Sequence, residues 1–219
     1  MESTEPHIPN FHTHFLTPGA PALYNLLPPY DLPVFAHQYL SAGIHPWFID
    51  NHLEIYLNRI EDLLRQNNLR AVGETGLDKI KGPHTELQTR IFEIHIEWAQ
   101  NAHLPLVIHC VKAHPEILAL LKKHNFREPV IFHGFRSRWN VARPLVEAGY
   151  YLSFGPAVLK PSVFLEETIR LTPLEQLLIE TDDSQVSIKE IFQAIKNIRQ
   201  ISDETLTAHL AQKFNVLFS

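Results

Sequence analysis

The sequence lacks several features that would place it outside the ordinary globular proteins. It has a single cysteine, Cys110, among 219 residues, which excludes an internal disulfide and fits a reducing compartment such as the cytoplasm. It has no run of about 18 apolar residues, so no membrane-spanning helix is predicted. Its first ten residues have neither the basic nor the apolar region of a secretory signal. We therefore expect a cytoplasmic protein with no membrane partner.

An excess of positive charge is also lacking. The formal net charge is −5, which gives no general attraction to nucleic acid or to an anionic membrane. Hydrophobic residues make up 45% of the chain and charged residues 20%, which is ordinary for a globular protein. No linker or low-complexity segment divides the sequence. We expect residues 1–219 to form a single domain that is a monomer and has no obligate protein partner.

Short apolar runs alternate along the chain with longer amphipathic segments. Eight runs have the composition of buried strands: residues 8–14, 21–27, 38–44, 69–74, 104–109, 129–133, 150–155 and 176–180. Helical spacing of apolar residues is found between them, in 52–66, 84–102, 114–124, 138–149 and 162–170. Leu87, Ile91, Ile94 and Trp98 illustrate it, and so do Leu206, Leu210, Phe214 and Leu217.

This alternation predicts parallel strands that are joined by helical crossovers. With about eight strands, the expected fold class is α/β, a (β/α)8 TIM-type barrel. Residues 15–42 are rich in proline and show no convincing helix. The first crossover helix is therefore expected to be reduced or missing.

Four histidines and two carboxylate residues stand where the predicted strands end. His12 and His14 close the first run, Glu74, His109 and His133 end later strands, and Asp182 follows the last one. With 14 histidines in the chain, about one His-x-His pair is expected by chance, so the first pair alone proves little. In a parallel barrel, however, these strand ends open onto one face. Their side chains suit a divalent metal, which predicts a metal site.

The motifs NFHTH (10–14), GIHPW (43–47), VGETGLD (72–78), LPLVIHC (104–110), HGF (133–135) and ETD (180–182), with NVLF at 215–218, resemble the TatD family of metal-dependent hydrolases in the amidohydrolase superfamily. The resemblance implies two divalent metal ions, Zn, Mn or Mg. His12, His14, Glu74 and Asp182 would bind one metal, and Glu74, His109 and His133 the other, with Glu74 bridging. Asp182 would orient the attacking water and receive its proton, so Asp182 and Glu74 are the expected catalytic residues.

Two departures from the family pattern bear on metal and phosphate binding. Asn10 stands where the family usually has Asp, and an amide there would still be able to orient an imidazole. Val111 and Lys112 stand where the family commonly has Arg, and Lys acts on a phosphate only as a point charge.

Other residues of these motifs are candidates for substrate contacts or for contacts with the ligands. His45 is expected to line the pocket, either behind a ligand or against the substrate. Asp78 would hold a ligand or a loop, and both options stay open. Arg136 would meet a phosphate or lie in a solvated loop.

Three functions are compatible with these residues. The resemblance favours a phosphodiesterase, an exonuclease-type deoxyribonuclease that acts on DNA ends. The alternative is a two-metal hydrolase of a small amide, ester or phosphoester, because fold and metals do not fix the substrate. The third is a metal-binding protein without activity, which ranks last because no ligand is lost.

Overall fold

A computed structural model describes residues 7–16, 21–30 and 39–219. Its residues form two compact units. Unit 1 contains Met1–Leu23 and Gly134–Ser219, and unit 2 contains Tyr24–His133. Each unit is an alternation of strands and helices, and each is described by itself.

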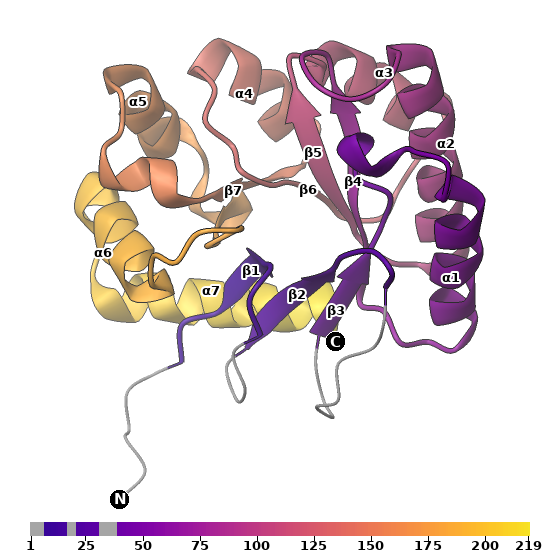
Figure 1. The fold of residues 1–219 in the computed structure, drawn as a ribbon. Coiled ribbons are helices and arrows are strands. Elements are labelled where there is room, and N and C mark those ends of the chain that lie inside the picture. Colours follow the sequence, from indigo (N-terminus) through magenta and orange to yellow (C-terminus); the bar gives the residue numbers. More distant parts are fainter. Residues whose placement is uncertain (1–6, 17–20, 31–38) are drawn as a thin grey trace, which may run out of the picture. The chain divides into compact units, whose positions relative to one another are not determined.

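Unit 2 contains four parallel strands that neighbour one another in chain order: β3 (Tyr39–Ala42), β4 (Ala71–Asp78), β5 (Leu106–Val111) and β6 (Val130–Phe132). They are connected by η1 (Pro46–Phe48), α1 (Leu53–Arg65), α2 (Thr85–Ala102) and α3 (His114–Lys123). All eight residues of β4 are buried, as expected for a parallel strand covered on both faces. Figure 1 shows the three α-helices along the outer side of these strands.

Unit 1 contains two parallel neighbours, β7 (Tyr151–Phe154) and β8 (Leu177–Ile179), and strand β1 (Asn10–Thr13). A parallel bridge between Thr13 and Asp182 places β1 beside the segment that follows β8. The helical elements are α4 (Trp139–Glu147), η2 (Pro156–Leu159), α5 (Val163–Leu171), η3 (Leu174–Gln176), α6 (Ile188–Arg199) and α7 (Asp203–Phe218). Strand β2 (Ala22–Leu26) begins in unit 1 and ends in unit 2.

Each unit has its own core. In unit 2, Leu40 and Ala42 of β3 pack with Ile60, Leu63 and Ile91 of the helices. In unit 1, helix α7 runs along β1 (Figure 1), and Phe11 contacts the rings of Phe214 and Phe218 at centroid distances of 5.4 and 6.0 Å. Burial of such side chains is the main force that holds β1 in place.

The predicted strands are all found, and the amphipathic segments are helices. The apolar positions predicted for α7, Leu206, Leu210, Phe214 and Leu217, are buried. In α2 the predicted apolar positions are partly wrong. Leu87 is 38% exposed, and the buried face instead includes the polar Gln88 and His95, because both have hydrogen-bond partners inside unit 2.

The segment of residues 15–42 is the one expected to have a reduced or missing crossover helix. The described part of residues 15–42 contains β2 and β3 and no helix. Residues 17–20 and 31–38 lie outside the described residues. Among those described, no helix has the length and apolarity needed to cross a membrane.

Candidate metal site

Three histidines of unit 2 surround one carboxylate oxygen. Glu74 Oε1 lies 2.6 Å from His133 Nε2, 2.9 Å from His109 Nδ1 and 3.2 Å from His45 Nε2. The Glu74 side chain is only 6% exposed. The backbone at Glu74 is held in place by the Asn25 side chain, because the Glu74 amide donates a hydrogen bond of 2.8 Å to Asn25 Oδ1. Unit 2 thus brings together the predicted ligands Glu74, His109 and His133.

His45 joins this cluster more closely than the sequence indicates. Glu74, His109 and His45 form one group of three residues whose potential ligand atoms lie close together. Burial lowers the pKa of His45 more than the neighbouring Glu74 carboxylate raises it. A neutral imidazole can coordinate a metal, whereas an imidazolium cannot. His45 Nδ1 accepts the Trp47 amide at 3.0 Å, so in the neutral ring Nε2 carries the proton and donates toward Glu74 Oε1, 3.2 Å away. In this arrangement His45 orients the Glu74 carboxylate.

Asp78 holds both a loop and a predicted ligand. Its Oδ1 accepts the amides of Ile80 and Lys81 at 2.8 and 2.9 Å. Its Oδ2 accepts the Trp47 indole N–H at 2.8 Å and lies 3.5 Å from His109 Nε2. Burial acts to raise the pKa of Asp78, but these hydrogen bonds lower it overall. Asp78 therefore stays ionised and restrains the His109 ring, a common arrangement behind metal-binding histidines.

Unit 1 brings together the other three predicted ligands. Asp182 Oδ1 lies 3.5 Å from His12 Nε2 and 3.4 Å from His14 Nε2. The backbone sets this arrangement, because the Asp182 amide donates to His12 O at 3.0 Å and the His14 amide donates to Asp182 O at 3.1 Å. Asp182 has a left-handed backbone (φ 54°), a conformation that non-glycine residues adopt rarely and often at functional sites.

These distances fit a bound metal better than they fit direct hydrogen bonds. Ligand atoms about 2.0–2.1 Å from a tetrahedral Zn²⁺ are separated from one another by about 3.3–3.4 Å. The Asp182 oxygen is separated from both histidine nitrogens by 3.4–3.5 Å. Two neutral imidazoles and one carboxylate are also the donor types that Zn and Mn accept. The residues present therefore fit a divalent metal.

Asn10 has a different role from the one expected. Its amide oxygen accepts the Thr181 backbone N–H at 3.1 Å, and its Nδ2 donates to Thr181 Oγ1 at 2.8 Å. Thr181 Oγ1 also lies 3.1 Å from Thr13 Oγ1. The side chain of Asn10 thus ties β1 to the segment before Asp182. The idea that it orients an imidazole is not supported by its contacts, since both polar atoms of its amide are occupied by Thr181.

The remaining candidates lie at the surface. Lys112 follows β5 directly and is exposed, with a left-handed φ of 56°. Arg136 is exposed in the loop before α4 and lines a cavity of unit 1. Sequence reasoning missed Asn25, Gln88 and Glu180. Gln88 exchanges hydrogen bonds with the Asp78 backbone at 2.8 and 3.0 Å, and the fully buried Glu180 accepts the Gly134 amide at 2.5 Å.

The fold and these side chains define a class of α/β barrel proteins with histidine and carboxylate groups at strand ends. A solved structure of YjjV, a TatD homolog from Escherichia coli, aligns with 97% of this chain and 98% of its own, with a TM-score of 0.83 at 20% identity. A TatD family hydrolase from Entamoeba histolytica aligns with 81% of this chain and 73% of its own, with a TM-score of 0.65 at 19% identity. The predicted TIM-type barrel class is confirmed.

The chain belongs to the TatD family. The family model described as "TatD related DNase" matches residues 34–219, a range that leaves out His12 and His14. A Mycobacterium tuberculosis protein, "Uncharacterized metal-dependent hydrolase TatD", is 34% identical over 153 residues, which are 66% of this chain and 57% of that protein. A Buchnera aphidicola metal-dependent hydrolase is 33% identical over 152 residues, which are 68% of this chain and 57% of that protein. The matched segments thus span under two thirds of these relatives.

Proposed function

We propose that this protein is a metal-dependent phosphodiesterase that shortens DNA from its ends. The observation that carries the proposal is the Asp182 carboxylate, whose Oδ1 lies 3.4–3.5 Å from the Nε2 atoms of His12 and His14, the spacing of ligand atoms around one divalent ion. The buried Glu74 carboxylate, with His109 and His133 beside it, adds donor groups of the same kinds. Membership of the TatD family supports hydrolysis, and the "DNase" in the family's description supports DNA as the substrate.

The proposed ligands are the six that the family resemblance implies. His12, His14, Glu74 and Asp182 would hold one metal, and Glu74, His109 and His133 would hold a second. Bound metal ions would activate water near neutral pH and offset the charge on the phosphate oxygens. Asp182 orients the attacking water and receives its proton. Asp78 and Trp47 keep the His109 ring in position.

A small substrate is the second candidate. The net charge of −5 and the exposed Lys112 in place of a family arginine both weaken the grip on a polyanion. A two-metal hydrolase of a small amide, ester or phosphoester needs neither feature.

The test is a cleavage assay with protein reconstituted with Zn, Mn or Mg. The substrates are single-stranded DNA labelled at its 3′ or 5′ end, a simple phosphodiester, and a panel of amides and esters. Asp182→Asn removes the proposed base, and Asp183→Asn, at the exposed neighbouring position, is the matched control. We expect metal-dependent shortening of DNA that falls about 100-fold or more in Asp182→Asn and is kept in Asp183→Asn. Cleavage of only the amides or esters would overturn DNA as the substrate, and equal activity of both variants would overturn the role of Asp182.

A further inference from the structure

Three segments of unit 1 enclose a cavity that the proposed ligands do not line. They are the loop before α4, the region from η2 to the start of α5, and the loop before α6. The cavity has a volume of about 470 Å³, and its wall includes Arg136, Pro156, Leu159, Lys160, Leu165 and Val186. A cavity of this size accommodates a nucleotide or a ligand of similar size.

The charge of this cavity is positive. Arg136 and Lys160 are the charged residues of its wall. Neither side chain makes a hydrogen bond or ion pair with any residue in the described part of the chain. Glu166, six residues after Lys160, pairs with Arg170 at 2.5 Å. The two cations are therefore available to an anion.

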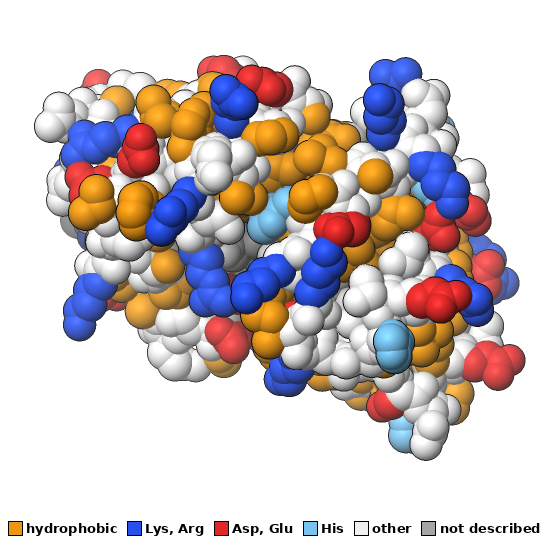
Figure 2. Space-filling view, turned by 90° about the horizontal axis from the view of Figure 1, so that it is seen from above, with side chains coloured by type: hydrophobic (Ala, Val, Ile, Leu, Met, Phe, Trp, Pro, Cys, Tyr) orange, Lys and Arg blue, Asp and Glu red, His pale blue; other side chains and the backbone are white. Residues whose placement is uncertain are grey.

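The rest of the wall is largely apolar. Leu165, which is 3% exposed, Leu159, which is 38% exposed, and Val186 all belong to the wall. On the face that Figure 2 presents, Lys and Arg side chains lie beside hydrophobic ones. A free anion such as sulfate gains nothing from an apolar wall. A phosphate ester that carries a flat ring uses both parts.

The cavity lies at the same strand ends as Asp182. Strands β7 and β8 are parallel with Phe154 paired to Ile179, so the segments that follow them leave the sheet at one edge. Pro156 comes two residues after β7, and Val186 comes four residues after Asp182. A ligand in this cavity thus lies on the side of unit 1 where Asp182 is placed.

We propose that this cavity binds an organic phosphate with an apolar ring, with the phosphate held by Arg136 and Lys160 and the ring against Leu159, Leu165 and Val186. Its role as a subsite for the part of the substrate that flanks the reacting phosphate rests on the proposed function. Binding itself does not, because it requires no metal.

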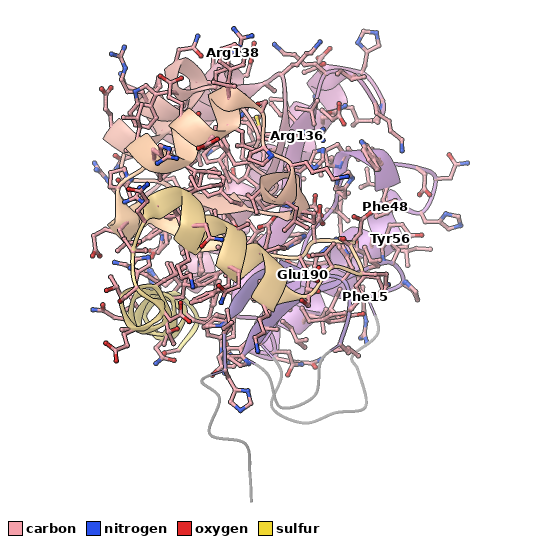
Figure 3. All side chains as sticks on the ribbon, turned by 90° about the vertical axis from the view of Figure 1, so that its left-hand side faces the viewer. Phe15, Phe48, Tyr56, Arg136, Arg138 and Glu190 are labelled. Atoms are coloured by element: carbon pink, nitrogen blue, oxygen red, sulfur yellow. The ribbon has the colours of Figure 1, made fainter. Side chains whose placement is uncertain are left out.

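Arg138 provides a matched control. It lies two residues from Arg136 in the same loop, but its guanidinium stacks over the Phe164 ring at 3.8 Å and it is not part of the cavity wall. Figure 3 shows Arg138 near the edge of the view and Arg136 nearer its middle. Loss of either positive charge changes the net charge equally, so only a specific contact distinguishes the two variants.

The test is an NMR titration of the full chain in EDTA, which prevents binding through a metal. The probes are deoxyadenosine 5′-monophosphate, deoxyadenosine, inorganic phosphate and a short single-stranded deoxyoligonucleotide. We expect the monophosphate to bind more tightly than either of its parts. Its affinity should fall about tenfold or more in Arg136→Gln and in Lys160→Gln, and stay within about twofold in Arg138→Gln.

Three results would overturn the proposal: no binding of the monophosphate at millimolar concentration, equal loss in all three variants, or equal binding of inorganic phosphate. An oligonucleotide that displaces the monophosphate and binds more tightly would identify a DNA strand as the occupant, whereas tighter binding of the monophosphate would identify a free nucleotide. Because the titration contains no metal, its failure leaves the DNA cleavage assay unaffected, and failure of that assay leaves this result standing.

Discussion

His95 connects helix α2 to the backbone beside the candidate metal site, and its protonation is expected to destabilise the fold. The ring is fully buried, with Nδ1 2.7 Å from Ile91 O and Nε2 2.8 Å from the Ile44 amide. An amide can only donate and a carbonyl can only accept, so the ring is neutral and carries its proton on Nδ1. A second proton on Nε2 would remove the acceptor for Ile44, the residue before His45.

The size of this effect follows from the pKa of His95, which burial lowers from 6.5 to about 4. Below pH 6.5 the unfolded chain takes up a proton at His95, while the folded protein does not until the pH approaches 4. The contribution of neutral His95 to the free energy of unfolding is therefore fully present above pH 6.5 and decreases as the pH falls. Because one unit of pKa is worth about 1.4 kcal/mol, the His95 contribution to this loss reaches about 3 kcal/mol near pH 4.

The assay is urea unfolding at several pH values from 7.5 to about 4.5, with wild type and His95→Gln compared. We expect the variant to be less stable at pH 7.5 but to lose less stability on acidification. Burial also lowers the pKa of His45, His114 and His209, but these residues are present in both proteins and cancel in the comparison. His52→Gln, at a side chain that is 62% exposed, should keep the wild-type pH dependence. The same slope for wild type and His95→Gln would refute the reasoning.

Three further predictions concern single side chains of the two units. Gly76→Ala should destabilise strongly and lower the midpoint of thermal unfolding, because its Cβ would lie 2.1 Å from a carbonyl oxygen of β5 at a φ of +145°. Asn10→Ala should cost about 2 kcal/mol of unfolding free energy in urea, since it leaves the buried Thr181 amide without its side-chain acceptor; no loss would exclude the link we describe. Glu74→Gln should retain less Zn or Mn after dialysis, measured by elemental analysis, than Glu86→Gln at an exposed position; equal metal content would contradict a ligand role for Glu74.

The strands could be predicted from the sequence because each is a short apolar run buried on both faces. Helix α6 is absent from the predicted segments although the sequence marks its start. Ser187 and Glu190 form a capping box, in which each side chain accepts from the backbone of the other. The buried face of α2 was predicted less well, because spacing of apolar residues cannot show that Gln88 and His95 are buried with polar partners.

The predicted metal ligands could be chosen because they end strands, and parallel strands end together. Their partners could not be chosen in this way. Asn25 holds the Glu74 amide across 49 residues of sequence, and Asn10 holds Thr181 across 171. Such contacts depend on which strands become neighbours in the folded chain, so no local sequence pattern predicts them. His45 was placed near the site by its motif, but its distance of 3.2 Å to Glu74 follows only from the folded chain.

The central claim is that Glu74, together with the histidines beside it in unit 2, holds a divalent metal ion. The most direct test is a crystal structure of the Zn-loaded protein with anomalous scattering recorded at the zinc edge. We predict a zinc peak within bonding distance of Glu74, His109 and His133, about 2.0–2.2 Å from their ligand atoms. A zinc peak that Glu74 does not bind, or no zinc peak in unit 2, would contradict the claim.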